Sequence, residues 1–161
     1  MYIEEKIDGA NLGISVDPQT QEILVQNRSH YISGIGGNHA QFNRIHEWTA
    51  RHREALYELL GTRDRILYGE WLVARHSIPY QRLPDIFVAF DLYDKTEKKF
   101  LSRERFHLAL KGSGIPVVPV IFSVVFEKKD AKKFRQIVLR LLESSRSAFR
   151  SDDGPVEGIV L

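Results

Sequence analysis

The chain has 161 residues, of which 43% are hydrophobic, which suffices for one domain with a real core and is too short to favour two. Its 23 Lys and Arg residues nearly balance 21 Asp and Glu residues, so the net charge of +2 exerts no general attraction on nucleic acid. There is no cysteine, which excludes disulfides, thiolate metal sites and cysteine nucleophiles. Apolar runs of membrane-spanning length and a signal-peptide pattern are both missing, so we predict a soluble cytoplasmic protein with no membrane contact.

The first half of the chain mixes strand and helix patterns. Segments 12–16 and 22–26 flank a proline-containing turn and predict a hairpin. Apolar residues recur at helical spacing over 42–60, which predicts one amphipathic helix. Apolar residues dominate 65–74 and 85–93, which predicts two well-buried strands.

The second half predicts a helix over 102–111, a β-branched strand over 115–126 and a basic amphipathic helix over 129–145. The lysines and arginines of that last helix predict a solvated face rather than a nucleic-acid contact. The glycine-rich stretch 34–37 lacks the strand and helix order of a phosphate-binding fingerprint, so we predict a surface loop there. The chain closes on an apolar strand pattern over 155–161.

A short segment near the start of the chain, Lys6-Ile7-Asp8-Gly9, combines an amine, a carboxylate and a glycine. On extended backbone, side chains two residues apart point to the same side, so Lys6 and Asp8 would lie together. Gly9 allows the backbone to approach a ligand closely. The segment can place an amine beside a phosphate, and an ordinary strand ending in an Asp-Gly turn is the alternative.

Three carboxylates, those of Glu70, Asp91 and Glu157, occur singly within apolar strand patterns. A buried carboxylate must be paired, neutralised or bound to a metal, unless it faces water on the polar side of the sheet. For Asp91 a structural hydrogen-bonding role is an equal alternative. Together with Lys6, the carboxylates indicate Mg²⁺-assisted phosphate chemistry.

Taken together, these segments resemble the covalent nucleotidyltransferases, and within them the ATP-dependent RNA ligase family. The resemblance rests on five segments in the family's order, which are Glu5-Lys6-Ile7-Asp8-Gly9-Ala10-Asn11, Asn27-Arg28-Ser29, Tyr68-Gly69-Glu70-Trp71, Phe87-Val88-Ala89-Phe90-Asp91-Leu92-Tyr93 and Val156-Glu157-Gly158-Ile159-Val160. These segments extend over nearly the whole chain. Segment 69–80 is more similar to the RNA-joining branch than to DNA ligases.

The resemblance implies an α+β fold, with two mainly antiparallel sheets flanking a nucleotide cleft and helices outside them. It also implies a single adenylyltransferase domain over residues 1–161. Its partners would be ATP and strand ends of RNA, or of DNA, that carry a 3′-hydroxyl and a 5′-phosphate.

The resemblance further implies that Lys6 is the catalytic residue. Its neutral amine would attack the α-phosphate of ATP and form lysyl-AMP, from which AMP passes to a 5′-phosphate before a 3′-hydroxyl seals the strand. Mg²⁺ or Mn²⁺ would organise the phosphates, with Glu70 and Glu157 as metal ligands. Phe90 would stack on adenine, and Phe87 would replace it if the strand showed its other face. The implied cofactor-binding set is Glu5, Lys6, Asp8, Gly9, Asn11, Arg28, Glu70, Phe90 and Glu157.

The chain departs from the family pattern after its last strand. Family members continue into a strand whose lysines hold the α-phosphate, whereas this sequence stops at Leu161. We therefore predict a domain that is incomplete at its C-terminus, and adenylylation that is weakened by about 10²- to 10³-fold for each missing donor. A DNA ligase, a GTP-using capping enzyme and a noncatalytic nucleotide- or nucleic-acid-binding module stay open as alternatives.

Overall fold

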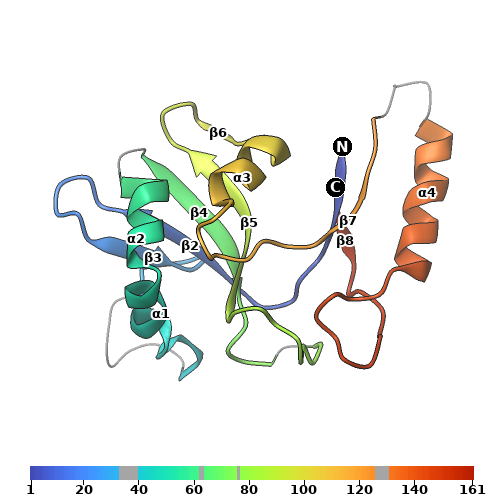
Figure 1. The fold of residues 1–161 in the computed structure, drawn as a ribbon, viewed down its shortest axis with the longest axis horizontal. Helices are drawn as coiled ribbons and strands as arrows, with labels where there is room; N and C mark the ends of the chain where they lie inside the picture. The colour runs from blue at the N-terminus through green and yellow to red at the C-terminus, as the bar shows by residue number, and fades with distance from the viewer. Residues whose placement is uncertain (33–39, 62–63, 76, 126–130) are drawn as a thin grey trace. The chain divides into compact units, whose positions relative to one another are not determined.

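The computed structural model describes residues 1–32, 40–61, 64–75, 77–125 and 131–161. They form two compact units, each containing one antiparallel sheet (Figure 1). The smaller unit comprises residues 1–8, 75–84 and 118–161, and the larger unit comprises residues 9–74 and 85–117. The predicted α+β fold with two antiparallel sheets is confirmed.

The larger unit is built on a five-stranded sheet of order β3-β2-β4-β5-β6. Its strands are β2 (Ala10–Val16), β3 (Ile23–Gln26), β4 (Arg65–Trp71), β5 (Phe87–Asp94) and β6 (Lys99–Phe100). Burial alternates along β4, where Leu67 and Trp71 are buried and Tyr68 and Glu70 are half-buried. This period of two leaves one face of the sheet against the core and the other face open. The predicted hairpin and the two predicted strands that follow it are confirmed.

Helical elements cover the core face of this sheet, and they are η1 (Ala40–Phe42), α1 (Ile45–Arg51), α2 (Arg53–Leu56), η2 (Tyr57–Gly61, a π-helical turn) and α3 (Arg103–Leu110). The prediction of one continuous helix over 42–60 is wrong. The break lies at His52, whose backbone nitrogen and imidazole Nδ1 lie 3.1 and 3.0 Å from the carbonyl oxygen of Trp48. A side chain that shares a helix carbonyl in this way destabilises the helix slightly and bends it, although the backbone hydrogen bonds from His52 to Trp48 and from Leu56 to His52 are kept. Burial of the helices against the sheet compensates for the interruption, since Trp48 and Leu56 are almost fully buried.

The predicted helix over 102–111 is confirmed as α3. Ser102 adopts extended backbone just before the helix, and its side chain accepts a hydrogen bond from the Arg105 N–H. A serine in this position satisfies a donor that the helix itself leaves unpaired. The buried side chains Phe106 and Leu110 lie one turn apart and anchor α3 in the core of the larger unit.

The smaller unit contains a three-stranded sheet of order β7-β1-β8 together with a helix, and its elements are β1 (Tyr2–Glu5), β7 (Val120–Ser123), α4 (Ala131–Ser144) and β8 (Ile159–Val160). The strand predicted over 115–126 forms only in part, because Pro116 and Pro119 have no N–H to donate to a sheet. Their carbonyl groups still accept hydrogen bonds, Pro116 from Ala89 in the larger unit and Pro119 from Glu5 in the smaller one. The predicted terminal strand is likewise reduced to β8.

The basic helix predicted over 129–145 is confirmed as α4, on which Arg135 and Arg140 are exposed, in agreement with a solvated face. The glycine-rich stretch 34–37 and the two lysines at 128 and 129 lie outside the described residues. Within the described part of the chain, no helix is long and apolar enough to span a bilayer.

Candidate functional site

Lys6 follows the central strand of the smaller sheet directly. Its backbone N–H donates to the carbonyl of Gly158 at 3.0 Å, so the residue lies beside the start of β8. Its side-chain amine forms an ion pair with the carboxylate of Glu157. The two side chains are 48% and 27% exposed, so a ligand can reach both. The structure therefore brings together the two residues expected to bear the nucleophile and one of the metal carboxylates.

Asp8 organises the segment that carries Ser77 and Tyr80. Its carboxylate accepts hydrogen bonds from the N–H of Ser77, at 2.8 Å, and from the Ser77 hydroxyl. Its own N–H donates to the Tyr80 hydroxyl at 3.0 Å. Ser77 and Tyr80 were not predicted as site residues, although both lie in the segment 69–80 that supports the resemblance.

The Tyr80 phenol lies among carboxylates. Burial raises the pKa of Tyr80 to about 12; the hydrogen bond from Asp8 N–H opposes this shift, and the negative charges of Glu5, Glu157 and Asp8 add to it. Phe149 meets the Tyr80 ring edge-on at 6.4 Å between centroids. Tyr80 is therefore a neutral hydroxyl at physiological pH, close to the residues around Lys6.

Glu5, the residue before Lys6, is only 2% exposed. One of its carboxylate oxygens accepts a hydrogen bond from the Ala148 N–H at 3.1 Å. The other oxygen, Oε1, is buried and has no hydrogen-bond partner among the residues that the structure describes. A buried acceptor without a donor is uncommon in native proteins, and a bound ligand is one way to satisfy it. The role of Glu5 in cofactor binding stays a prediction.

In the larger unit, Asn11 and Glu70 are direct cross-strand partners on β2 and β4. Partners in an antiparallel pair point to the same face, so the two side chains lie together on the open face. Gly9 precedes β2, and a Cβ atom there would lie 2.7 Å from a methyl carbon of Leu72 and 2.8 Å from the carbonyl oxygen of Trp71. Close packing inside the unit therefore requires a glycine at this position.

The two phenylalanines of β5 have different environments. Phe87 is fully buried, packs 4.9 Å from the ring of Trp48 and fills the space left by Gly69. It is a core residue, so it is unsuited to stack on adenine. Phe90 is half-buried at an irregularity in the pairing of β4 with β5, and its carbonyl accepts a hydrogen bond from Arg103 at 2.6 Å. Phe90 stays the candidate for stacking on adenine.

Asp91 and Arg28 have separate surroundings. Burial raises the pKa of the Asp91 carboxyl, and the guanidinium of Arg103, which pairs with it, opposes that shift. The pairing supports the structural alternative for Asp91. Arg28 is exposed on a turn in which the Asn27 side chain accepts hydrogen bonds from the N–H groups of Ser29 and His30.

The described residues contain no group of three or more His, Asp or Glu side chains arranged to hold a metal ion. Assignment of Glu70 and Glu157 as metal ligands stays a prediction. Their carboxylate oxygens are the donor type that Mg²⁺ and Mn²⁺ prefer, and such ions commonly take their remaining ligands from substrate phosphates and water.

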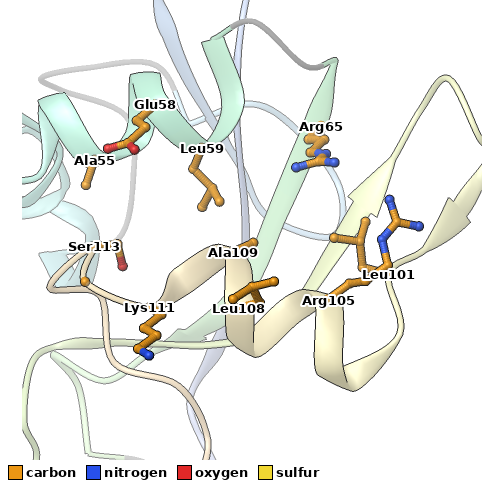
Figure 2. A pocket seen from close by; sticks show the side chains of 11 residues that line it. Ala55, Glu58, Leu59, Arg65, Leu101, Arg105, Leu108, Ala109, Lys111 and Ser113 are labelled. Carbon is orange, nitrogen blue, oxygen red and sulfur yellow. The ribbon is translucent and has the colours of Figure 1, made fainter.

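A cavity of about 470 Å³ opens in the larger unit between η2 and α3 (Figure 2). Its charged lining consists of Glu58, Arg65, Arg105 and Lys111, and its apolar lining includes Leu59 and Leu101. No residue of the predicted site lines it. The cavity is therefore separate from the chemistry that the motifs suggest.

The family model for RNA ligases matches residues 1–161, so the chain belongs to the RNA ligase family. No curated protein sequence gives a significant match.

The fold is similar to that of solved RNA ligase structures from Naegleria gruberi. The structure of that ligase with pyrophosphate has a TM-score of 0.72 at 19% identity. A lysine-to-alanine mutant with ATP and Mn gives 0.68 at 17% identity, and a glutamate-to-alanine mutant with AMP and Mn gives 0.64 at 16% identity. In each case the match covers 98% of this chain and 44% of the Naegleria chain. This chain therefore spans less than half the length of these proteins.

Proposed function

We propose that this chain is the adenylyltransferase domain of an ATP-dependent RNA ligase, with Lys6 as its nucleophile. The observation that carries the proposal is the accessible Lys6 amine beside the Glu157 carboxylate, within a chain whose whole length matches the RNA ligase family. The Naegleria structures with ATP, AMP and pyrophosphate support the choice of nucleotide.

In the proposed reaction the nitrogen of Lys6 forms a bond to the α-phosphorus of ATP while the bond to pyrophosphate breaks. The amine must lose a proton, because an ammonium has no lone pair. Glu157 contacts this amine, and because we assign its carboxylate to the metal ion, the proton passes to solvent. Asp8 contributes by holding the Ser77–Tyr80 segment in place through three hydrogen bonds.

Other residues of the set receive separate roles. We assign Glu70 and Asn11, which share one face of the larger sheet, to the ribose and the phosphates, Phe90 to adenine and Arg28 to ribose or the 5′-phosphate end. Mg²⁺ or Mn²⁺, with Glu70 and Glu157 as ligands, would supply charge stabilisation for the departing pyrophosphate. AMP would then pass to the 5′-phosphate of a strand end. Attack on that phosphate by a 3′-hydroxyl would join the two ends and release AMP.

Incubation with α-³²P-labelled ATP and Mg²⁺ or Mn²⁺, followed by denaturing electrophoresis, tests the first step. We expect a label that is acid-labile and alkali-stable, as a phosphoramidate is, and that Lys6→Ala abolishes. Lys111→Ala removes another exposed lysine and should keep the label. Labelling from GTP alone would favour a capping enzyme. ATP binding by calorimetry without any label would indicate a noncatalytic binding module.

The second step distinguishes the nucleic acids. The labelled protein is chased with 5′-phosphorylated RNA or with DNA of the same sequence, and transfer of AMP to the strand end is followed. We expect faster transfer to RNA. Preferred transfer to DNA would replace the RNA ligase proposal with the DNA ligase alternative.

A further inference from the structure

Four aromatic side chains lie on the open face of the five-stranded sheet. We call Tyr31, Tyr68, Tyr93 and Phe100 the aromatic face. Tyr93 and Phe100 are cross-strand partners with ring centroids 5.1 Å apart, and Tyr68 lies 6.1 Å from Phe100. Tyr31 forms a bridge with Gln26 at the end of β3, and Gln26 pairs with Gly13, the partner of Tyr68, so Tyr31 shares this face. Segments far apart in the sequence thus bring their rings to one surface.

Electrostatic effects agree with this proximity. Burial raises the pKa of the Tyr68 phenol, and Tyr93 and Tyr31 raise it further against the opposing charge of Lys95. The Tyr68 ring also lies against the backbone of β2, because a Cβ atom at Gly13 would be 3.0 Å from it. Tyr68 therefore forms the floor of the aromatic face, with the other rings around it.

Two rings of the aromatic face are largely uncovered, since Phe100 is 53% exposed and Tyr31 is 60% exposed. Cross-strand aromatic pairs stabilise sheets by contact with each other, but that role does not require so much ring surface to face solvent. Exposed apolar surface that is gathered in one place and bordered by polar residues is typical of an interaction site.

Positive charges border the aromatic face. The turn between β5 and β6 carries Lys95 and Lys98 against the single acid Glu97, and Arg28 lies three residues before Tyr31. Lys95 pairs with Asp64 at 2.7 Å. Exposed pairs of this kind are worth little, so phosphates can compete for these lysines.

The aromatic face is continuous with the residues assigned to ATP. Glu70 is two positions from Tyr68 on β4, so both side chains point to the open face. Its partner Asn11 lies on the same face. A strand end bound near Glu70 and Asn11 would therefore have aromatic rings beside its next nucleotides.

We propose that the aromatic face binds unpaired nucleotides of an RNA strand, whose bases stack on Phe100 and Tyr31 while the bordering lysines contact phosphates. The inference rests on the proposed function, because it names where that function would hold its RNA. Exposed aromatic rings beside positive charges are the usual means of binding single strands, since every base has a face that can stack. Bases of duplex RNA are already stacked on one another and would not use the aromatic face.

The first test measures the affinity for a short fluorescein-labelled oligouridylate by fluorescence anisotropy. We expect Phe100→Ala to weaken binding about tenfold. Phe100→Leu, which stays apolar but cannot stack, should weaken binding nearly as much. Leu108→Ala is the control, because Leu108 is 72% exposed on α3 and does not belong to the aromatic face. Binding by Phe100→Ala within twofold of the parent overturns the proposal, provided that thermal melting shows both proteins folded.

The second test uses Phe100→Trp as a reporter, because Trp48 and Trp71 are both only 1% exposed. Stacking of uracil on the new indole should quench its fluorescence, and a short RNA duplex should not. Equal quenching by both, or none by the single strand, contradicts the proposal.

Labelling from ATP is measured on the same variants, so that the two proposals can fail separately. Phe100→Ala should keep the lysyl-AMP label of the parent. An unlabelled parent that still binds oligouridylate through Phe100 would contradict the labelling proposed for this chain and would leave the proposal of an RNA-binding surface standing.

Discussion

The two units differ in what they bury. In the larger unit, one cluster contains most of the large apolar side chains that are fully buried, among them Trp48, Trp71, Phe87 and Phe106. The smaller unit buries fewer side chains, and two of those are the carboxylates Glu4 and Glu5. Apolar residues of its short strands are partly exposed, including Val120, Phe122 and Val160. The larger unit is thus stabilised by its core, whereas the smaller one places charged groups around Lys6.

The largest effect on stability is expected from emptying a core site, and it should be larger in the larger unit than in the smaller one. Trp48→Ala should lower the free energy of unfolding by about 3–5 kcal/mol, because it empties a well-packed site. Phe149→Ala, in the smaller unit, should cost about 2 kcal/mol, because a sparsely packed site collapses more easily. Denaturant unfolding measures both values.

Hydrogen exchange by mass spectrometry sharpens the comparison. Trp48→Ala should reduce the protection of amides in β4 and β5. Phe149→Ala should reduce it in β1 and at Lys6, whose N–H donates a hydrogen bond to the carbonyl of Gly158. If either variant lowered protection equally throughout the described residues, the units would unfold together and the contrast would be lost.

A second prediction concerns a buried charge in the larger unit. The Glu97 N–H and the Arg65 guanidinium lower the pKa of Asp94. A lowered pKa contributes stability that is present above the unfolded value of about 3.9 and is lost as the pH falls through the folded value. Asp94→Asn should therefore lower the free energy of unfolding by about 2 kcal/mol at neutral pH, with the difference shrinking on acidification.

Urea unfolding over a range of pH measures this dependence. Asp64→Asn is the matched control, because Asp64 is 51% exposed and pairs with Lys95 at the surface. It should change stability by less than about 1 kcal/mol. An Asp94→Asn deficit that persists unchanged at acid pH would assign the loss to packing rather than to charge.

The smallest effect is expected at Tyr80 in the smaller unit. Tyr80→Phe removes the acceptor for the Asp8 N–H and should cost about 1 kcal/mol at neutral pH. Because the pKa of Tyr80 is raised to about 12, its contribution is complete below the unfolded value of about 10 and is lost as the pH rises to the folded one. The parent should therefore weaken in alkali more than the variant does.

Ultraviolet titration of phenolate absorbance tests this assignment directly. Burial raises the pKa of both Tyr80 and Tyr68, so both phenols should ionise late in the parent, and Tyr80→Phe should lose only the share of Tyr80. Tyr31→Phe removes a phenol that is 60% exposed and should leave the late component in place. Loss of the late component in Tyr31→Phe would place the shifted phenol elsewhere.

Much of the secondary structure followed from local pattern. The hairpin, the strands β4 and β5 and the helix α3 formed where period and capping predicted them, because each depends on neighbouring residues. The helix over 42–60 did not, because the Trp48 carbonyl is shared with the His52 side chain. That competition depends on how the ring is held in the fold, by stacking on Trp48 and pairing with Asp85.

The sequence by itself determined the α+β class, the RNA ligase resemblance and the choice of Lys6 and Glu157, because motif order and residue chemistry are local information. Only the tertiary structure decided that Glu157 contacts Lys6 from 151 positions away, that Phe87 belongs to the core, and that Asp8 holds Ser77 and Tyr80. It alone gathered the aromatic face from four segments. Sheet pairing and burial decide such contacts, and they bring together residues that are far apart along the chain. The positions of these residues in the sequence do not indicate the contact.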